Sequence, residues 1–261
     1  MPRFAVAGMA VLAIAALTAA ACDATSGART PASSPSAVSP QDTLLTAAAA
    51  LNAASYEVAA DIDHWRFKGR VDPTVKAAEL ELKDTDDQEY SIAMLQVGAE
   101  NWLKMDFGPG DNKDFGLRPD RWMKIDTKTV RNIAKLPFVP QATLDVLGVS
   151  GLLSGLSNAV RIDPTHYSGT IDLHKSAGVA AFYLGEGNGK VLGDKAAAVP
   201  FTATLDEQGR LAGITLAAGE GDTRVSLSLT LSKHGAPSGL TKPAANATAP
   251  FPSELNAFFR E

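Results

Sequence analysis

Several residues of this sequence have the chemical types used in catalysis, but their spacing does not predict an active site. The run Gly148–Leu152 (GVSGL) lacks the second glycine of the Gly-x-Ser-x-Gly turn that exposes a nucleophilic serine. The run Gly185–Lys190 (GEGNGK) is similar to a phosphate-binding loop. Val191 stands where that loop has Ser or Thr, so we interpret the run as a hairpin loop. We therefore expect no catalytic residues and no enzymatic activity; an unrecognised hydrolase, which would need a nucleophile–base pair, is the remaining catalytic alternative.

Metal and nucleic-acid chemistry have equally little support. The four histidines, at 64, 166, 174 and 234, are not spaced as ligands, and no Cys or carboxylate motif completes a site. Asp84, Asp86 and Asp87 lack the loop and closing Glu of a calcium site, so a turn explains them better. The net charge is −5, and the 24 basic residues are scattered among 29 acidic ones. Because nucleic-acid surfaces need clustered Lys and Arg, we expect no metal, no cofactor and no nucleic-acid partner.

Cys22 is the residue for which the sequence predicts a defined reaction. The uncharged, apolar stretch Phe4–Ala21 follows Arg3 and has the layout of a secretory signal peptide. The run Thr18–Ala21 directly before Cys22 resembles the bacterial lipobox, in which the Cys thiol is acylated, for example with palmitate, and becomes the new N-terminus. We predict a signal peptide over residues 1–21, lipidation at Cys22 and an extracytoplasmic protein anchored to the bacterial cell membrane. The alternatives are ordinary cleavage after an Ala, with Cys22 incidental, or a membrane span, for which this stretch is marginally long.

The residues after Cys22 predict a tether and then one domain. Residues 23–38 (DATSGARTPASSPSAV) have no apolar periodicity and are rich in Ser, Ala, Pro and Thr. We therefore interpret residues 22–38 as the lipidated Cys with a flexible tether, whose typical reach is ~20–25 Å. Residues 39–261 are expected to form a single domain, which is an ordinary size for one hydrophobic core.

The elements of this domain follow from the spacing of apolar residues. Ser39, Pro40 and Asp42 predict the start of a helix that ends near Ala54. Apolar residues alternating with polar ones predict strands over residues 55–63, 76–83, 89–97, 101–107, 121–125, 167–173, 199–205, 211–217 and 223–233. Helical segments are expected over 126–136, 141–156 and 253–259, the second of them broken by glycines at 148, 151 and 155.

These elements predict an α+β domain built on a large curved antiparallel sheet. Alternation with one wet face and one dry face is typical of antiparallel meanders. A strongly twisted sheet of many strands tends to curl, so helices such as the Leu-rich segment 141–156 are expected to cover its concave face. Sheet and helices would then enclose either a packed core or a cavity.

The order of these segments resembles a known family. Besides the lipobox-like Cys22, the matching segments are LNAASYEVAADI, GRVDPTVKAAELEL from Gly69, AENWLKM with RWMKID, VLGVSGLLSGLSNAVRID, THYSGTIDL, VPFTATLDEQGRLAGITLAAG and VSLSLTLSKHGAP. In sequence and spacing they resemble the LppX/LprG type of bacterial lipoproteins, which belong to the LolA-like class of open β-barrels. The resemblance implies an unclosed half-barrel that hides acyl chains between its sheet and its helices, and that carries or presents acylated lipids or glycolipids.

Alternation and helical spacing nominate the side chains that would line such a cavity. From the sheet they are Val58, Ile62, Leu80, Leu82, Met94, Leu103, Met105, Leu227 and Leu229, and from the covering segment Leu144, Leu147, Leu152, Leu153 and Leu156. Trp102, Trp122 and Tyr167 are expected to pack against the sheet more than to line a ligand mouth. The expected partners are a lipid or glycolipid, the membrane through the N-terminal acyl chains, and a membrane transporter or envelope protein. The alternative is a tethered structural or interaction module of the cell envelope, with a filled core and a protein partner.

Overall fold

The structure, a computed structural model, describes residues 38–86, 90–125, 144–185, 192–219 and 224–258. All of them belong to one unit, Val38–Glu261, which contains every described strand and the whole buried core and so has what it needs to fold on its own. The predicted signal peptide, Cys22, most of the tether and the helix expected over 126–136 lie outside the described residues.

A meander of six strands forms one half of the sheet. Its members are β1 (Tyr56–Ile62), β2 (Trp65–Asp72), β3 (Ala77–Asp84), β4 (Tyr90–Val97), β5 (Glu100–Phe107) and β6 (Trp122–Ile125). Each strand pairs antiparallel with the next, and the registers place the main apolar set of each strand on one face. In this half of the sheet, the alternation of apolar and polar residues along the sequence therefore corresponds to an apolar face and a more polar face.

A second meander forms the other half and joins the first in the middle. Its strands are β7 (Leu156–Arg161), β8 (His166–Ile171), β9 (Val199–Leu205), β10 (Leu211–Ala218) and β11 (Val225–Ser232), and β11 pairs antiparallel with β1. A two-residue strand, β12 (Thr248–Ala249), pairs parallel with β6. The 12-stranded sheet runs from β12 at one edge to β7 at the other, and these edges do not pair within the described residues. The predicted unclosed sheet is confirmed, with the correction that β12 makes it mixed.

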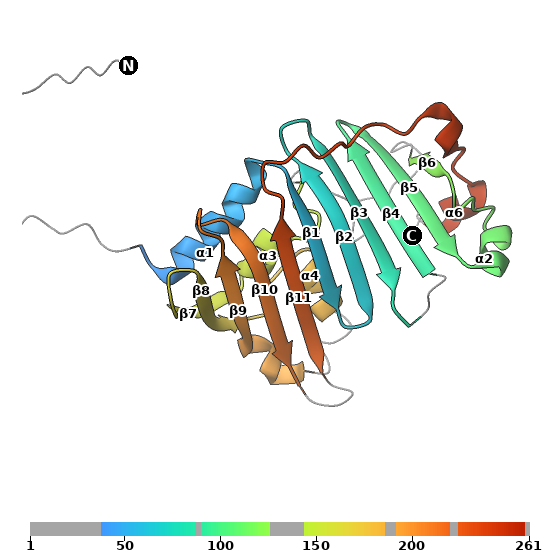
Figure 1. Cartoon of the computed structure of the whole chain (residues 1–261). Helices are drawn as coiled ribbons and strands as arrows, with labels where there is room; N and C mark the ends of the chain where they lie inside the picture. Colours follow the sequence, from blue (N-terminus) through green and yellow to red (C-terminus); the bar gives the residue numbers. More distant parts are fainter. Residues whose placement is uncertain (1–37, 87–89, 126–143, 186–191, 220–223, 259–261) are drawn as a thin grey trace, which may run out of the picture. The chain divides into compact units, whose positions relative to one another are not determined.

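Three of the helices, α1 (Pro40–Ala49), α3 (Val149–Leu153) and α4 (Val179–Gly185), cover one face of this sheet. The other helices of the described residues are η1 (Ala50–Asn52), α2 (Pro109–Asp114), η3 (Gly193–Ala198), η5 (Ala245–Ala247) and α6 (Ser253–Phe258). Helix α1 packs on α3, β7 and β10, while α4 packs on α3, β1 and β11 (Figure 1). We call the sheet face that these three helices cover the inner face.

The start of α1 follows the predicted capping pattern. Ser39 Oγ accepts a hydrogen bond from the Asp42 backbone N–H at 3.0 Å and donates one to the Asp42 carboxylate at 2.7 Å. In contrast, the covering segment is less helical than the sequence suggests. Among residues 144–156 only α3 is helical, and Leu156 already begins β7. Gly148 has a φ of +65°, which ends any helix preceding α3.

The outer face carries a segment that returns across the sheet. Residues 233–252, which we call the C-terminal strap, run from β11 past the ends of β1 to β5 and reach the β6 edge (Figure 1). Ser55 Oγ donates to the Ala236 carbonyl at 2.6 Å, and Ser238 Oγ donates to Asp72 at 2.9 Å. Leu240 is buried with Leu95 and Trp102 in a small second core. The strap therefore ties the middle of the sheet to its β6 edge.

Gly69 is predicted to be essential for the close approach of β1, β2 and β3. A Cβ at this position would lie 2.7 Å from the Glu79 carbonyl oxygen and 3.0 Å from Val58 Cγ1. We expect Gly69→Val to lower the free energy of unfolding by ~1–3 kcal/mol because the added atoms force the strands apart. Gly110→Ala, where a Cβ meets nothing within 4 Å, is the control and should change it by less than ~0.5 kcal/mol. Urea denaturation of residues 38–261 measures both, and equal midpoints would contradict the expectation.

Candidate functional site

The inner face of β1–β6 is built from continuous cross-strand rows of uncharged side chains. One row passes through six strands and contains Val58, Gly69, Leu80, Met94, Leu103 and Met123. The next row contains Ala60, Phe67, Leu82, Ile92 and Met105. Apart from Gly69, these side chains are buried, with at most 5% of their surface exposed. They offer an extended apolar surface with no acid or base on it.

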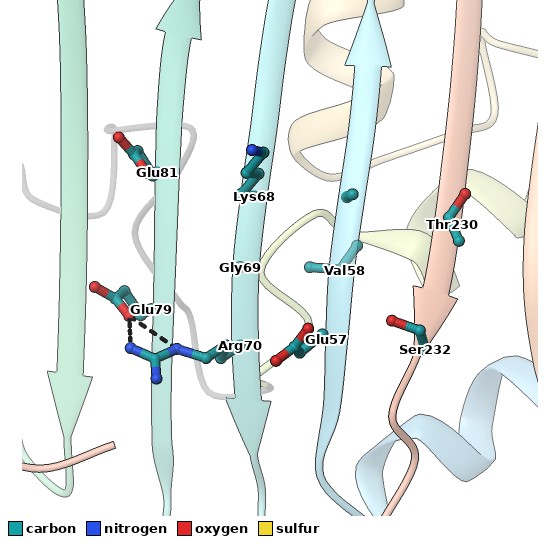
Figure 2. Close-up of a pocket in the computed structure, with 10 residues that line it drawn as sticks. Glu57, Val58, Lys68, Gly69, Arg70, Glu79, Glu81, Thr230 and Ser232 are labelled. Carbon is teal, nitrogen blue, oxygen red and sulfur yellow. Dashed lines mark hydrogen bonds and ion pairs between the residues drawn. The ribbon is translucent and has the colours of Figure 1, made fainter. Parts of the chain in front are cut away.

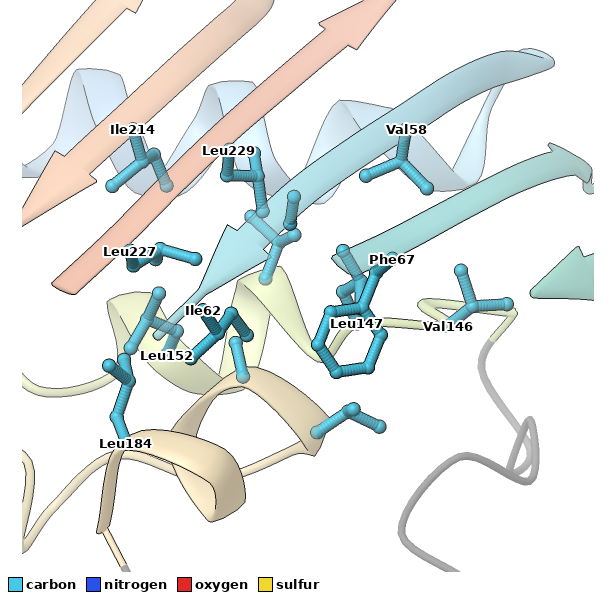
Figure 3. Packing of buried hydrophobic residues seen from close by; sticks show 14 of the residues in the cluster. Val58, Ile62, Phe67, Val146, Leu147, Leu152, Leu184, Ile214, Leu227 and Leu229 are labelled. Atoms are coloured by element: carbon cyan, nitrogen blue, oxygen red, sulfur yellow. The ribbon is translucent and has the colours of Figure 1, made fainter. Parts of the chain in front are cut away.

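The residues nominated from the sequence come together in this region. Val58, Ile62, Leu80, Leu82, Met94, Leu103, Met105, Leu147, Leu152, Leu153, Leu156, Leu227 and Leu229 belong to one buried cluster, and Leu144 packs against it half-buried. Figure 3 shows Ile62, Leu152 and Leu227 converging between the sheet and the helices α3 and α4. A filled core and a closed cavity both produce such burial, so the role of these residues as a lipid cavity stays a prediction.

Methionine is concentrated on the inner face of the β4–β6 half. The chain has five methionines. Met94, Met105 and Met123 all lie in the buried cluster, and the other two, Met1 and Met9, precede the described residues. Unbranched thioether side chains adopt many shapes at little cost, so such a surface can rearrange around a flexible guest.

Aromatic side chains border one end of the inner face, where β1 turns into β2. We call Trp65, Tyr90, Phe107 and Tyr183 the aromatic row. Ring centroids lie 5.7 Å apart for Trp65 and Tyr90, 4.9 Å for Tyr90 and Phe107, and 5.4 Å for Trp65 and Tyr183. All four are half-buried, and the neighbouring Phe182 is 38% exposed. The apolar surface therefore reaches solvent through an aromatic border.

Sequence reasoning missed this border. Trp65 lies in β2 and Tyr183 in α4, two elements that were not predicted. Tyr90 begins β4 and Phe107 ends β5, and both of these strands were predicted. The aromatic residues considered instead pack as expected. Trp102 is buried against Leu240 on the outer face, and Tyr167 lies in the main core. The available signal was the β4–β5 hairpin register, which sets Tyr90 opposite Phe107.

The tyrosines of the aromatic row are held in their neutral form. Burial raises the pKa of Tyr90 above its ordinary value, and the nearby Asp84 carboxylate adds to the shift. Burial likewise raises the pKa of Tyr183, with a smaller contribution from Tyr90. The border of the inner face therefore carries no charge at neutral pH on these two hydroxyls.

Two polar side chains interrupt the inner face at its opposite end. Gln96 and Asn101 face each other across β4 and β5, in a row that continues through Ala78 and Ile125. Gln96 Oε1 and Asn101 Oδ1 are shielded from solvent and have no hydrogen-bond donor within the part of the chain that the structure describes. An unpaired buried acceptor lowers the free energy of unfolding by about 1–3 kcal/mol, so this pair destabilises the ligand-free protein.

The depression on the outer face has a different character. Its volume is about 510 Å³, and its lining includes Glu57, Lys68, Arg70, Glu79 and Glu81 (Figure 2). Arg70 is paired with Glu79 through two of its nitrogens, and the register sets Lys68 opposite Glu81. Charges of opposite sign thus compensate one another across the strands, as is usual on a wet sheet face. Of the nominated cavity residues, only Val58 borders this depression.

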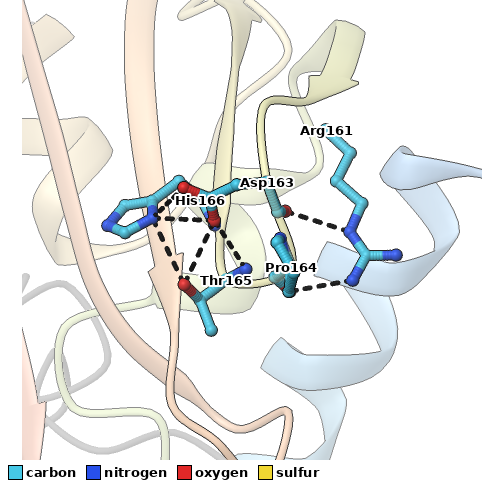
Figure 4. Close-up of polar contacts among 5 residues, drawn as sticks. All are labelled: Arg161, Asp163, Pro164, Thr165 and His166. Atoms are coloured by element: carbon cyan, nitrogen blue, oxygen red, sulfur yellow. Dashed lines mark hydrogen bonds and ion pairs between the residues drawn. The ribbon is translucent and has the colours of Figure 1, made fainter.

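A histidine–carboxylate pair closes a turn. His166 Nδ1 lies 2.8 Å from Asp163 Oδ2 (Figure 4), and the Asp163 carboxylate also accepts from the backbone N–H groups of Thr165 and His166. These hydrogen bonds lower the pKa of Asp163. Thr165 Oγ1 contacts the same Nδ1 at 3.2 Å, whereas a catalytic relay needs its nucleophile on Nε2. The group therefore stabilises the β7–β8 hairpin.

Within the described ranges no group of three or more His, Cys, Asp or Glu side chains is arranged to hold a metal ion. No helix in that part of the chain is both long enough and apolar enough to cross a membrane.

Comparison with solved structures finds a likeness of fold. No protein-family model and no curated protein matches the chain. The crystal structure of the Mycobacterium tuberculosis lipoprotein LppX is similar over 77% of this chain and 96% of that one, with 19% identity and a TM-score of 0.40. The family resemblance expected from the sequence is thus confirmed as a likeness of fold.

Tyr90 allows the border of the inner face to be tested by pH. Because its pKa in the folded state is raised above about 10, its contribution to stability is present below that pH and is lost as the pH rises further. We expect Tyr90→Phe to match the wild type at about pH 8 and to lose less stability between about pH 9 and pH 11. Urea midpoints across this range measure the effect. Parallel curves for the two proteins would show that Tyr90 is not buried as described.

Proposed function

We propose that this protein is a membrane-anchored lipoprotein that binds acylated lipids or glycolipids between the inner face of the sheet and the covering helices, and that carries or presents them. The observation that carries the proposal is the uncharged, Met-rich inner face, which continues as far as the half-buried aromatic row. Acyl chains have no polar group to satisfy, so this surface matches them chemically.

The driving force would be the transfer of acyl chains from water to this surface. Each buried CH₂ contributes ~0.8 kcal/mol, so even part of one chain outweighs the cost of moving a few side chains. Met94, Met105 and Met123 supply the adaptability that a guest of variable length requires. Half-buried Trp and Tyr rings suit the opening because they tolerate contact with both water and lipid.

Anchoring is the second part of the proposal and rests on the sequence. An acylated Cys22 would hold the tether at the membrane surface, and the domain beginning at residue 39 would reach the bilayer without entering it. A domain held at this distance can exchange lipid with the membrane and keep the bound chains out of water.

A matched pair of variants on β3 tests the binding site. Leu82 is buried on the inner face, and its neighbour Lys83 points to the outer face with 56% of its side chain exposed. We expect Leu82→Trp to weaken binding of a fluorescent acyl-chain probe to residues 38–261 at least tenfold, because the indole occupies space needed by the guest. Tenfold corresponds to about 1.4 kcal/mol, less than the burial of two CH₂ groups. Lys83→Trp should leave the affinity within about twofold.

Thermal unfolding and near-ultraviolet circular dichroism establish that both variants are folded, and Met105→Trp replaces Leu82→Trp if the latter is not. Native mass spectrometry of the domain, purified from its own host without detergent, identifies any bound lipid. A ligand-free mass that persists after incubation with host lipid extract, together with no binding of the probe, would contradict the proposal. A tethered interaction module with a filled core would then be the better account.

Membrane anchoring is tested separately through Cys22. We expect Cys22→Ala to move the protein from the membrane fraction to the soluble fraction, because the thiol that receives the acyl chain is gone. Fractionation of host cells and mass spectrometry of the N-terminal peptide measure this. A protein that stays in the membrane fraction after the substitution would favour an uncleaved membrane-spanning segment.

A further inference from the structure

The pair Gln96 and Asn101 is the feature of the inner face that the proposed function leaves unexplained. Their row is otherwise built from buried apolar residues, including Ala78 and Ile125. Each side chain is half-buried as a whole, yet its carbonyl oxygen is shielded from solvent. The pair therefore sits where the apolar surface meets the other end of the sheet.

The orientation of one amide is determined by its own hydrogen bond. Gln96 Nε2 donates to the Gly98 carbonyl at 3.2 Å. Rotating this amide would set its oxygen against the Gly98 carbonyl, and two acceptors repel each other. Gln96 Oε1 is therefore committed to the buried side, where Asn101 Oδ1 is also an acceptor. Two acceptors cannot satisfy each other, so in this arrangement neither oxygen receives a hydrogen bond from the other side chain.

We infer that Gln96 and Asn101 form a polar subsite that accepts hydrogen bonds from a donor group of the bound lipid, a hydroxyl or an amide N–H. This inference rests on the proposed function and adds the class of lipid that the site selects. A neutral donor fits because no carboxylate belongs to this row, so a cationic group would be uncompensated there.

The position of the subsite also sets the direction in which the lipid lies. Gln96 and Tyr90 are six residues apart on β4, which corresponds to about 20 Å along the strand. The rows containing Met94 and Ile92 lie between them. A lipid with its donor at Gln96 and Asn101 therefore extends its acyl chains along β4 toward the aromatic row.

A pair of lipids that differ only in the donor tests this subsite. The probes are 1,2-dioleoylglycerol and its 3-O-methyl ether, each competing with a fluorescent acyl-chain probe for residues 38–261. We expect the wild type to bind the alcohol about tenfold more tightly than the ether. In the double variant Gln96→Met with Asn101→Leu, this preference should fall to about one, with the affinity for the ether unchanged. Asn246→Leu, an exposed amide in η5, is the matched control and should keep the preference.

The stability of the ligand-free double variant separates recognition from a structural role. If the oxygens are unpaired, replacing the amides with apolar side chains leaves the urea midpoint unchanged or raises it. A cross-strand amide hydrogen bond would instead make the midpoint fall, which would overturn the inference.

The binding data have equally distinct outcomes. Equal binding of the alcohol and the ether by the wild type, or a preference that survives in the double variant, would overturn the subsite and leave the proposed function standing. Binding of the probe but of neither lipid would also overturn the subsite, whereas no binding of the probe or of either lipid would overturn the proposed function itself.

Discussion

The structure depends on a single constraint: a sheet of 12 strands that does not close must keep one face dry. From β1 to β5 and from β9 to β11 the side chains alternate so that one set enters the main core. Because the edges β12 and β7 do not pair with each other among the described residues, helices must provide the shielding that closure gives a barrel. Helices α1, α3 and α4 do so over β1, β7, β10 and β11. A ligand of the inner face must therefore fit between the sheet and the helices, two layers that are not joined into a closed barrel.

The two faces of the sheet do different work. Cross-strand registers sort Leu80 and Leu82 to the inner side and Glu79 and Glu81 to the outer side of the same strand. The outer side is stabilised by compensated charges and by the C-terminal strap, so it is specified independently of any guest. The inner side contains adaptable methionine side chains, the half-buried aromatic row, and two amide oxygens without a hydrogen-bond donor among the described residues. Unsatisfied polar groups and partly exposed apolar side chains on a sheet that is otherwise well packed are typical of a binding surface.

The sequence predicted the strands whose alternation is uninterrupted and missed those where a backbone feature breaks it. Residues 199–205 were assigned with the bounds that β9 has, because Val199, Phe201, Ala203 and Leu205 alternate cleanly. Strand β2 was missed because Gly69 stands where its inner face needs a side chain, and β7 because Asn158 has a φ of +53° in a bulge. The nominated inner-face residues follow from period two alone. The aromatic row and the Gln96–Asn101 pair do not, since both depend on registers between strands. The aromatic row also depends on α4, which no local pattern reveals.

The central pairing of β1 with β11 joins Glu57–Ile62 to residues 227–232, near the far end of the chain. Contacts of such high sequence separation form late, because most of the loop-closure entropy must be lost before they stabilise anything. The two meanders can form hairpins locally, but the continuous inner face exists only after nearly the whole chain is available. A chain with this topology cannot complete its core before most of it has been synthesised. For a protein that we propose is exported, the same slow step keeps it competent to thread through a membrane channel before it folds.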